Sequence, residues 1–525
     1  MHISRPKVIS QGLVKFYTVG GKENFGIKTS IEVHQVIDPT YQTPEYTAYV
    51  IDDVPDWLIA LPLDFVAEKL GSGEKLETAI KKALSLISVK SNAENIDLAR
   101  RVFERWLNGY GAFTPLFLMP EVTDVYIRKL DDGLVVHVNH EELGLMRVII
   151  GWEPYELITR RGLKKAIKKI TVGDFDAVSY LFRRLSIRMK TPITTHNPMP
   201  DLVDPEFRIR IAVTSDPVGR PTPWTSIRVL PRRPRLITEL IRNNVISIDQ
   251  AALLWLLADY KVPILFVGPM GAGKTTLQNA IAFLLVDRVI ALVMDVVELF
   301  LPYHRVVLPM LERRAFARGI ESIDKVRLIN HSLRSGADII LVNEARGDEE
   351  FRALLEAMTL GHGTITTFHA NDYEDAVTRL KVKGFVDAER FLSEAVVVEV
   401  GLVKESVRDE GGVVRVVHRR FVRTIRNAEK HVEVLTRDYG KDTIDRQLRY
   451  RVEFLTKAIE LNPTPEQLAS LLYAFYKDPE GVLAVKPSVE AIESLNLPRL
   501  ELPSEVLNLD NEVLGLEKEP FKGSG

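Results

Sequence analysis

Hydrophobic and polar positions change their period along the first 230 residues. After a strand-like opening, apolar residues recur at helical spacing over 63–87 and 96–107, and no chemical motif occurs before about residue 115. From Glu121 onward, short runs alternate apolar and polar residues, which is typical of half-buried strands. A helical pattern at 173–189 interrupts these runs. The predicted strands are 122–127, 134–138, 145–150, 208–213 and 224–229.

The pattern changes again after a short basic segment. Residues 231–235 (PRRPR) are predicted to be a linker, because two prolines suppress helix and the arginines favour solvent. Beyond it, continuous apolar runs at 263–267, 289–294 and 338–343 alternate with helical stretches. Strands without a polar face are buried on both sides. We therefore predict an α/β domain with a parallel sheet covered by helices on both faces.

The C-terminal part is predicted to be helical. Residues 442–461 and 465–476 have helical spacing, and the second helix is expected to begin with Thr464 as N-cap and Pro465 at its first position. The acidic and apolar tail after Pro498 is expected to be loosely held. The predicted parts are an N-terminal accessory region (1–115), a smaller α+β domain (116–230), the linker (231–235), the α/β domain (236–430) and a helical C-terminal extension (431–525).

Composition and charge exclude several classes of protein. The 69 basic and 71 acidic residues give a net charge of -2, which provides no bulk attraction to nucleic acid or anionic lipid. The absence of cysteine excludes a disulfide framework and a CxxC zinc module. The best apolar run, Val289–Leu301, is interrupted by Asp295 and Glu298, and the N-terminus lacks the apolar core of a signal peptide. We expect a cytoplasmic protein that reaches a membrane only from its surface.

Residues 268–276 (GPMGAGKTT) have the spacing of a phosphate-binding loop between a strand and a helix. Glycines let successive N–H groups point inward, and the helix adds the positive end of its dipole. Lys274 is predicted to bind the β- and γ-phosphates of ATP, and the Thr275 hydroxyl to complete magnesium coordination. The alternative is a glycine turn with an incidental lysine. The predicted nucleotide-binding residues are Gly268, Pro269, Met270, Gly271, Ala272, Gly273, Lys274, Thr275 and Thr276.

A second candidate is Glu344, which ends the apolar strand 338–343. In P-loop folds a neighbouring strand delivers a carboxylate to the γ-phosphate and the metal, where it can orient or deprotonate the attacking water. The alternative is a strand-end glutamate that only pairs with Arg346.

Two histidines form the third constellation, in the stretch 361–370 (GHGTITTFHA). His362 and His369 could ligate a metal, but zinc needs three or four ligands and no cysteine or further histidine lies nearby to complete the set. A polar strand whose His369 hydrogen-bonds the γ-phosphate is the better interpretation.

Together these motifs resemble those of the ATPases of type II secretion, type IV pilus and archaellum assembly. That family has Walker A, Asp-box, Walker B and His-box motifs in this order. Segments upstream, such as 192–200 (PITTHNPMP), are also similar, and members with a zinc-binding CxxC module match less well. The tail over 442–478 is similar to that of archaeal members. The four motifs correspond here to 268–276, 292–299, 338–347 and 361–370, and the resemblance covers about 120–430.

The resemblance implies a RecA-like motor domain that forms a homohexameric ring. Nucleotide would bind between the P-loop and the N-terminal domain, with Arg208 and Arg228 as contacts and Arg210 as a poorer match; each could instead be a solvated surface charge. ATP hydrolysis to ADP and phosphate would power secretion or filament assembly through a polytopic membrane platform protein at the inner face of the cell membrane. ATP and Mg²⁺ are the implied cofactors, and neither nucleic acid nor zinc is expected.

The sequence also departs from the family pattern. The Asp box usually reads Glu-Asp, and the glutamate that is given the water-activating role is replaced by Met294. Asp295, Glu298 and Glu344 are left as candidates, and Glu344 is preferred because it ends a strand of the parallel sheet. Met294→Glu is expected to raise turnover if Met294 holds the family position. The milder departures are Asn343 at the Walker B glycine and Leu360 in the His box.

Two other functions stay open. The loss of a glutamate at Met294 is compatible with a scaffold that binds ATP but barely hydrolyses it. Related P-loop rings move DNA, so a nucleic-acid translocase is the third possibility, although the neutral charge and the lack of a basic, aromatic-interleaved stripe argue against it.

Overall fold

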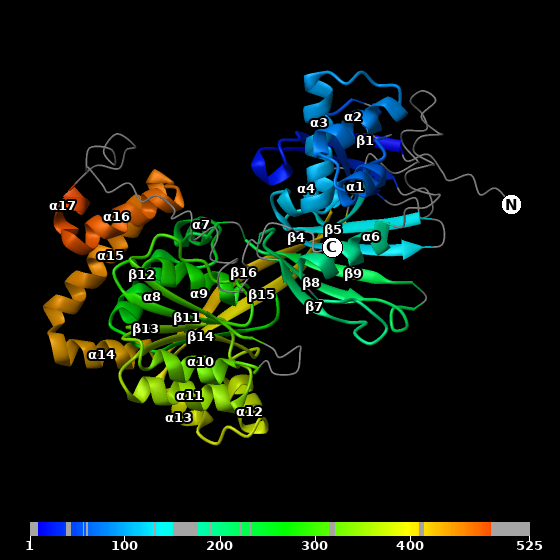
Figure 1. Ribbon diagram of the computed structural model, residues 1–525. Coiled ribbons are helices and arrows are strands. Elements are labelled where there is room, and N and C mark those ends of the chain that lie inside the picture. Colours follow the sequence, from blue (N-terminus) through cyan, green and yellow to red (C-terminus); the bar gives the residue numbers. More distant parts are fainter. Residues whose placement is uncertain are drawn as a thin grey trace. The chain divides into compact units, whose positions relative to one another are not determined.

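The chain folds into two compact units in a computed structural model, shown in Figure 1. The first comprises residues 1–230 and 405–417, and the second residues 231–404 and 418–525. The structure describes residues 9–37, 44–55, 57–58, 61–130, 133–150, 177–189, 191–204, 206–220, 222–231, 233–313, 321–408 and 414–484. The start of the predicted helix at 173–189 and the tail after Pro498 lie outside these residues.

The first unit contains a nine-stranded sheet in the order β1-β2-β3-β6-β5-β4-β9-β8-β7. Neighbouring strands are antiparallel except for β3 and β6, which are parallel and place Thr47 opposite Arg147. The strands are β1 (Ile9–Val19), β2 (Thr29–Ile37), β3 (Pro44–Asp52), β4 (Val122–Leu130), β5 (Gly133–His140), β6 (Gly144–Ile150), β7 (Asp201–Asp204), β8 (Ile209–Thr214) and β9 (Trp224–Val229).

The predicted boundary at 115/116 does not separate two domains. β1–β3 belong to the predicted accessory region, yet Ile31 and Val33 share one apolar core with Val125 and Val136 of β4 and β5. The β3–β6 pairing makes one sheet of both parts. Among the described residues, the α-helices of this unit are α1 (Leu63–Gly71), α2 (Leu76–Leu86), α3 (Ala93–Asn108), α4 (Thr114–Leu118) and α6 (Ala177–Arg188).

The second unit contains a seven-stranded sheet in the order β12-β11-β13-β14-β10-β15-β16. The pairings from β12 to β15 are all parallel, as the continuous apolar runs predicted. The strands are β10 (Ile264–Gly268), β11 (Val289–Met294), β12 (Val306–Leu311), β13 (Ile339–Val342), β14 (Gly363–His369), β15 (Val396–Arg408) and β16 (Val414–Arg426).

Alternate residues of these strands enter two apolar cores, one on each face of the sheet. Ile264 and Phe266 belong to one core, and Leu265 and Val267 to the other. The second unit therefore has the predicted RecA-like α/β fold. The first face packs against α7 (Ile237–Arg242), α8 (Ile248–Asp259), α9 (Lys274–Phe283), α14 (Ala428–Tyr439), α15 (Lys441–Leu461), α16 (Pro465–Lys477) and α17 (Pro479–Ala484). The second face packs against α10 (Lys325–Ser332), α11 (Asp348–Thr359), α12 (Tyr373–Val382) and α13 (Ala388–Glu394) (Figure 1).

The C-terminal helices are part of this core and not a separate extension, which corrects the predicted division at 430/431. Trp255 of α8 is fully buried and its ring contacts Phe454 of α15 and Phe475 of α16. The guanidinium of buried Arg451 lies 4.9 Å from the centre of the Trp255 ring and pairs with Asp259. Thr464 caps α16 as predicted, because its side chain accepts a hydrogen bond from the Gln467 N–H.

Within the described residues, no helix combines the length and the apolar character that a membrane span requires.

Candidate functional site

The loop 268–273 joins the central strand β10 to helix α9, which begins at Lys274. Gly271 and Gly273 have φ angles of 78° and 89°, in the left-handed region that favours glycine. A Cβ at Gly268 would collide with the carbonyl oxygen of Val400. Three glycines of the motif are therefore required by backbone geometry, and the loop brings the N-terminus of α9 to the carboxyl edge of the sheet.

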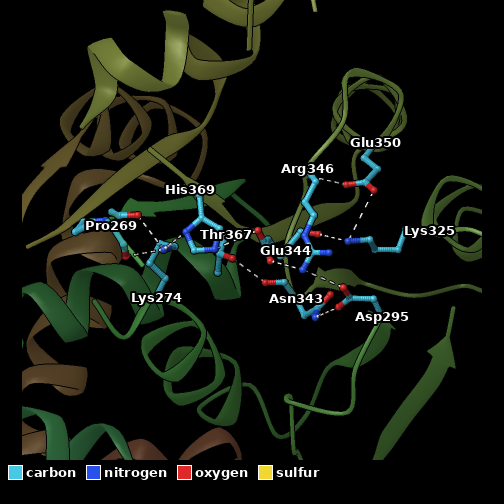
Figure 2. A network of polar contacts seen from close by, with 11 residues as sticks. Pro269, Lys274, Asp295, Lys325, Asn343, Glu344, Arg346, Glu350, Thr367 and His369 are labelled. Atoms are coloured by element: carbon cyan, nitrogen blue, oxygen red, sulfur yellow. Dashed lines mark hydrogen bonds and ion pairs between the residues drawn. The ribbon is translucent and has the colours of Figure 1, made fainter. Parts of the chain in front are cut away.

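Lys274 is buried at the bottom of this loop with 4% of its surface exposed. Its Nζ donates to the carbonyl oxygens of Gly268 (2.8 Å) and Pro269 (3.0 Å) and lies 3.0 Å from His369 Nδ1, as Figure 2 shows. Burial lowers the pKa of Lys274 to about 8, although Glu344 acts in the opposite direction. The partners of the lysine amine are thus two loop carbonyls and a ring nitrogen.

Four residues at the carboxyl ends of neighbouring strands face α9. Val293 lies opposite Val342 and Val342 opposite Thr366, so the next residues along, Met294, Asn343 and Thr367, follow one another across the sheet. His369 is two residues beyond Thr367 and shares its face, because strand side chains alternate. Met294 is 3% exposed and packs in the apolar core on this side. The sheet thus presents a polar row that ends in an apolar side chain where the family has a glutamate.

Glu344 follows β13 and is held on three sides. Its Oε2 accepts a hydrogen bond from Arg346 Nη2 (2.8 Å), and its Oε1 lies 3.2 Å from His369 Nε2. Lys325 Nζ donates to its backbone carbonyl oxygen at 2.6 Å. The pair with Arg346, which the sequence left open as the alternative, is therefore present, and the contact with His369 is present beside it (Figure 2). The salt bridge raises the pKa of Arg346, so this cation keeps its charge.

Asp295 lies beside Glu344 in the same network. Asn343 Nδ2 donates to Asp295 Oδ1 at 2.6 Å, and Arg346 Nη2 lies 3.1 Å from Asp295 Oδ2. One guanidinium nitrogen thus joins both carboxylates. Glu298, the third carboxylate candidate, is half-buried in the segment between β11 and β12.

His369 links the lysine to the glutamate. If Nδ1 accepts from Lys274, the ring proton is on Nε2 and faces Glu344 Oε1. Burial and the Lys274 charge lower the pKa of His369, and Glu344 opposes this effect, so the neutral tautomer fits both contacts. His362 instead contacts the Ala337 carbonyl oxygen at the other end of β14. Seven residues of strand separate it from His369, a distance of about 23 Å. No group of three or more possible His, Cys, Asp or Glu metal ligands occurs among the described residues.

The candidate arginines lie in the first unit. Arg210 of β8 is opposite Arg228 of β9, and Arg228 Nε lies 3.3 Å from Asp124 Oδ1. Arg208, just before β8, has a φ of 51°.

Sequence reasoning missed three residues that support the loop or the strand ends beside it. Arg420 Nε donates to the Gly271 carbonyl oxygen (2.9 Å), and buried Gln278 Nε2 donates to the Val342 and Ile365 carbonyl oxygens (2.7 and 3.1 Å). Lys325 is 4% exposed, although lysine usually lies at the surface. Gln278 lies among other polar residues in the first half of α9, and Arg420 and Lys325 bond to backbone carbonyls, so no motif specifies any of the three.

The parallel sheet, the glycine loop and the buried lysine define a P-loop NTPase domain of RecA-like architecture. The chain belongs to the family "Type II/IV secretion system protein", whose model matches residues 164–444, more than half of its 525 residues.

Two curated relatives illustrate the range of the family. An uncharacterised protein of Methanocaldococcus jannaschii is 29% identical over 296 residues, covering 56% of this chain and 48% of that protein. The type II secretion system protein E of Pseudomonas aeruginosa is 33% identical over 124 residues, 22% of each chain. This chain spans about half the length of the first curated relatives it matches. Among solved structures, the ATPase DotB of Legionella pneumophila matches with 13% identity and a TM-score of 0.39, covering 75% of this chain and 94% of that one.

Proposed function

We propose that this chain binds ATP with Mg²⁺ and hydrolyses it to ADP and phosphate. The observation that carries this proposal is the continuous contact from Lys274 through His369 to Glu344 at the carboxyl edge of a parallel sheet. A phosphate-binding cation, a histidine and a carboxylate come here from the P-loop helix, β14 and β13. This is the edge at which α/β sheets bind their ligands.

Each group has a role that follows from its contacts. Phosphate oxygens replace the Gly268 and Pro269 carbonyls as partners of Lys274 Nζ, because they carry full negative charge. His369 loses its lysine partner and turns its ring toward the γ-phosphate. Glu344 orients the attacking water and accepts its proton, for which the Arg346 bond must loosen. When Glu344 has accepted the proton, Arg346 keeps its ion pair with Asp295.

The donor set fits a magnesium ion, which prefers oxygen ligands and keeps several waters. Thr275 lies half-buried at the start of α9 and Glu344 at the facing strand end. The Oδ1 atom of Asn343 is buried and has no hydrogen-bond partner among the described residues, so the site contains an acceptor for a metal-bound water. Thr275 and Glu344 would hold the ion, which neutralises phosphate charge.

The ATPase would act as a homohexameric motor for secretion or for assembly of a pilus-like or archaellum filament. Family membership over 164–444 supports this assignment, as do the motifs described above. Arg208 and Arg228 would reach the nucleotide from the N-terminal domain of the ring. The partner would be a polytopic membrane platform protein, and the motor would work at the cytoplasmic face of the membrane.

Phosphate release from ATP by the purified protein tests this proposal. Lys274→Ala should abolish turnover and weaken ATP binding, because the phosphates lose their main side-chain cation. Glu344→Gln should keep binding and lose about 10²–10⁴-fold in turnover. Exposed Lys383→Ala and Glu356→Gln are matched controls that should behave like the natural protein. Normal turnover in Lys274→Ala would contradict the proposal.

A second candidate function is an ATP-binding scaffold with little turnover. The observation that favours it is that Met294 is packed in the apolar core while Arg346 holds both nearby carboxylates. ATP binding without measurable phosphate release in the natural protein would select this function.

A further inference from the structure

Asn343 is fixed at the end of β13 by both neighbouring strands. Its backbone N–H donates to the Val293 carbonyl oxygen (3.1 Å), and its carbonyl oxygen accepts from Thr367 Oγ1 (2.8 Å). The residue is 2% exposed. Its side chain faces α9, since Val342 before it enters the core on the opposite face. An amide in this position is part of the site and cannot turn away into solvent.

The orientation of this amide is determined by Asp295. A carboxylate only accepts hydrogen bonds, so the 2.6 Å contact with Asp295 Oδ1 must come from Asn343 Nδ2. The amide oxygen is then directed away from Asp295, and it has no hydrogen-bond partner among the described residues. A buried polar atom without a partner usually marks the place of a water or an ion.

The same amide lies beside the apolar position of the row. Met294 and Asn343 are neighbours on adjacent strands and share one face of the sheet. Met294 offers no carboxylate, whereas the Asn343 amide holds the next residue, Asp295, by its Oδ1. Arg346 Nη2 lies 3.1 Å from the other oxygen of Asp295 and 2.8 Å from Glu344. Asp295 is therefore held between an amide and a guanidinium, next to Glu344.

We infer that Asn343 is a positioning residue, which fixes the Asp295 carboxylate at the hydrolytic site and binds a water through its amide oxygen. This inference rests on the proposed ATPase function. It makes the Asn343–Asp295 pair a support of the site beside Met294, while Glu344 accepts the proton of the attacking water.

Exchange of the two side chains tests the pair. In Asn343→Asp, two carboxylates occupy a 2.6 Å contact and cannot both ionise, so one of them keeps its proton to a higher pH. Its folded-state pKa is raised, so stability present at low pH is lost as pH rises above about 4. As the pH rises, the melting temperature of Asn343→Asp should therefore fall relative to that of the natural protein. The charged groups beside this pair are Arg346, which contacts Asp295, and Glu344. Lys325 and His369 in turn contact Glu344.

The double variant Asn343→Asp/Asp295→Asn restores one amide and one carboxylate. Its melting profile should again run parallel to that of the natural protein, because the contact between an amide and a carboxylate is restored. Turnover should fall by about 10²-fold in Asn343→Leu, which keeps the shape but loses the donor, while ATP binding is retained. In Asn343→Asp turnover should fall only as pH rises.

The outcomes separate this inference from the ATPase proposal. Turnover of Asn343→Leu equal to that of the natural protein, or a melting profile of Asn343→Asp that follows it at every pH, overturns the positioning role. A natural protein that releases no phosphate overturns the ATPase function and the hydrolytic role of Asn343 with it. The melting profiles then still show whether the two side chains interact.

Discussion

In the proposed ATPase, Lys274 would change its partners when nucleotide binds, and its pKa makes this change depend on pH. Burial lowers the pKa of Lys274 to about 8, and phosphates favour the charged amine. Above pH 8 the free lysine is mostly neutral, so binding must first take up a proton. ATP affinity should therefore weaken by up to about tenfold for each pH unit above 8.

Calorimetric titration with ATP between pH 7 and 9.5 measures this effect. Lys274→Arg is the matched control, because a guanidinium keeps its charge over this range and its profile should be flat. A flat profile in the natural protein would show that Lys274 is already charged.

Met294 illustrates how the structure adds to a sequence prediction. Met294→Glu is expected to raise turnover if Met294 holds the family position, and the side chain is 3% exposed and belongs to the apolar core of the α9 face. A carboxylate without a cationic partner there should lower the free energy of unfolding by about 3–5 kcal/mol. Met294→Leu should change it by less than about 1.5 kcal/mol. Urea denaturation of the two variants measures the difference, and equal stability would mean that the site admits water.

At the scale of elements, the sequence predicted strands well where apolar residues are continuous and where apolar and polar residues alternate. The run 289–294 coincides with β11, and 224–229 with β9, because six apolar or alternating residues have few other arrangements. β15 and β16 were missed, since each begins or ends in charged residues that resemble a solvated loop. The β3–β6 pairing was also missed, because the two strands lie about a hundred residues apart in the sequence. A local pattern of apolar residues does not indicate which distant strand will pair with it.

The site was predictable where a local motif specifies it and not where it depends on contacts between distant elements. The glycines and Lys274 have a fixed spacing in one loop, so their arrangement follows from sequence alone. Asn343 and Lys325 could not be assigned, because their roles come from contacts between strands and helices that meet only in the folded unit.

The helices α15–α17 should be indispensable for the nucleotide-binding unit. Truncation after Gly440 removes Phe454 and Phe475 from the Trp255 core and deprives Asp259 of Arg451, so the second unit should fail to fold. Truncation after Ala484, which keeps every described helix, is the control and should retain its cooperative melting transition. Calorimetry distinguishes the two truncated proteins by their melting transitions. A stable protein ending at Gly440 would show that the second unit folds without α15–α17.

At the scale of the whole molecule, the proposed motor requires a ring. Multi-angle light scattering should show a hexamer, or a shift to one when a non-hydrolysable ATP analogue is added, because nucleotide would join a P-loop to the arginines of an N-terminal domain. The molar mass of Lys274→Ala should not change when the analogue is added. A monomer at every concentration and nucleotide state would exclude the ring.

The buried Trp255 gives the second unit its own optical label. The chain has five tryptophans, and the other four, Trp57, Trp106, Trp152 and Trp224, all precede residue 231. Trp255 Nε1 donates to Tyr476 Oη (2.9 Å) on α16, and Arg451 of α15 covers its ring. Replacing the other four by phenylalanine would leave tryptophan fluorescence that comes from Trp255 alone. A change of emission on adding ATP would then report a movement of α8 against the C-terminal helices, free of any signal from the first unit.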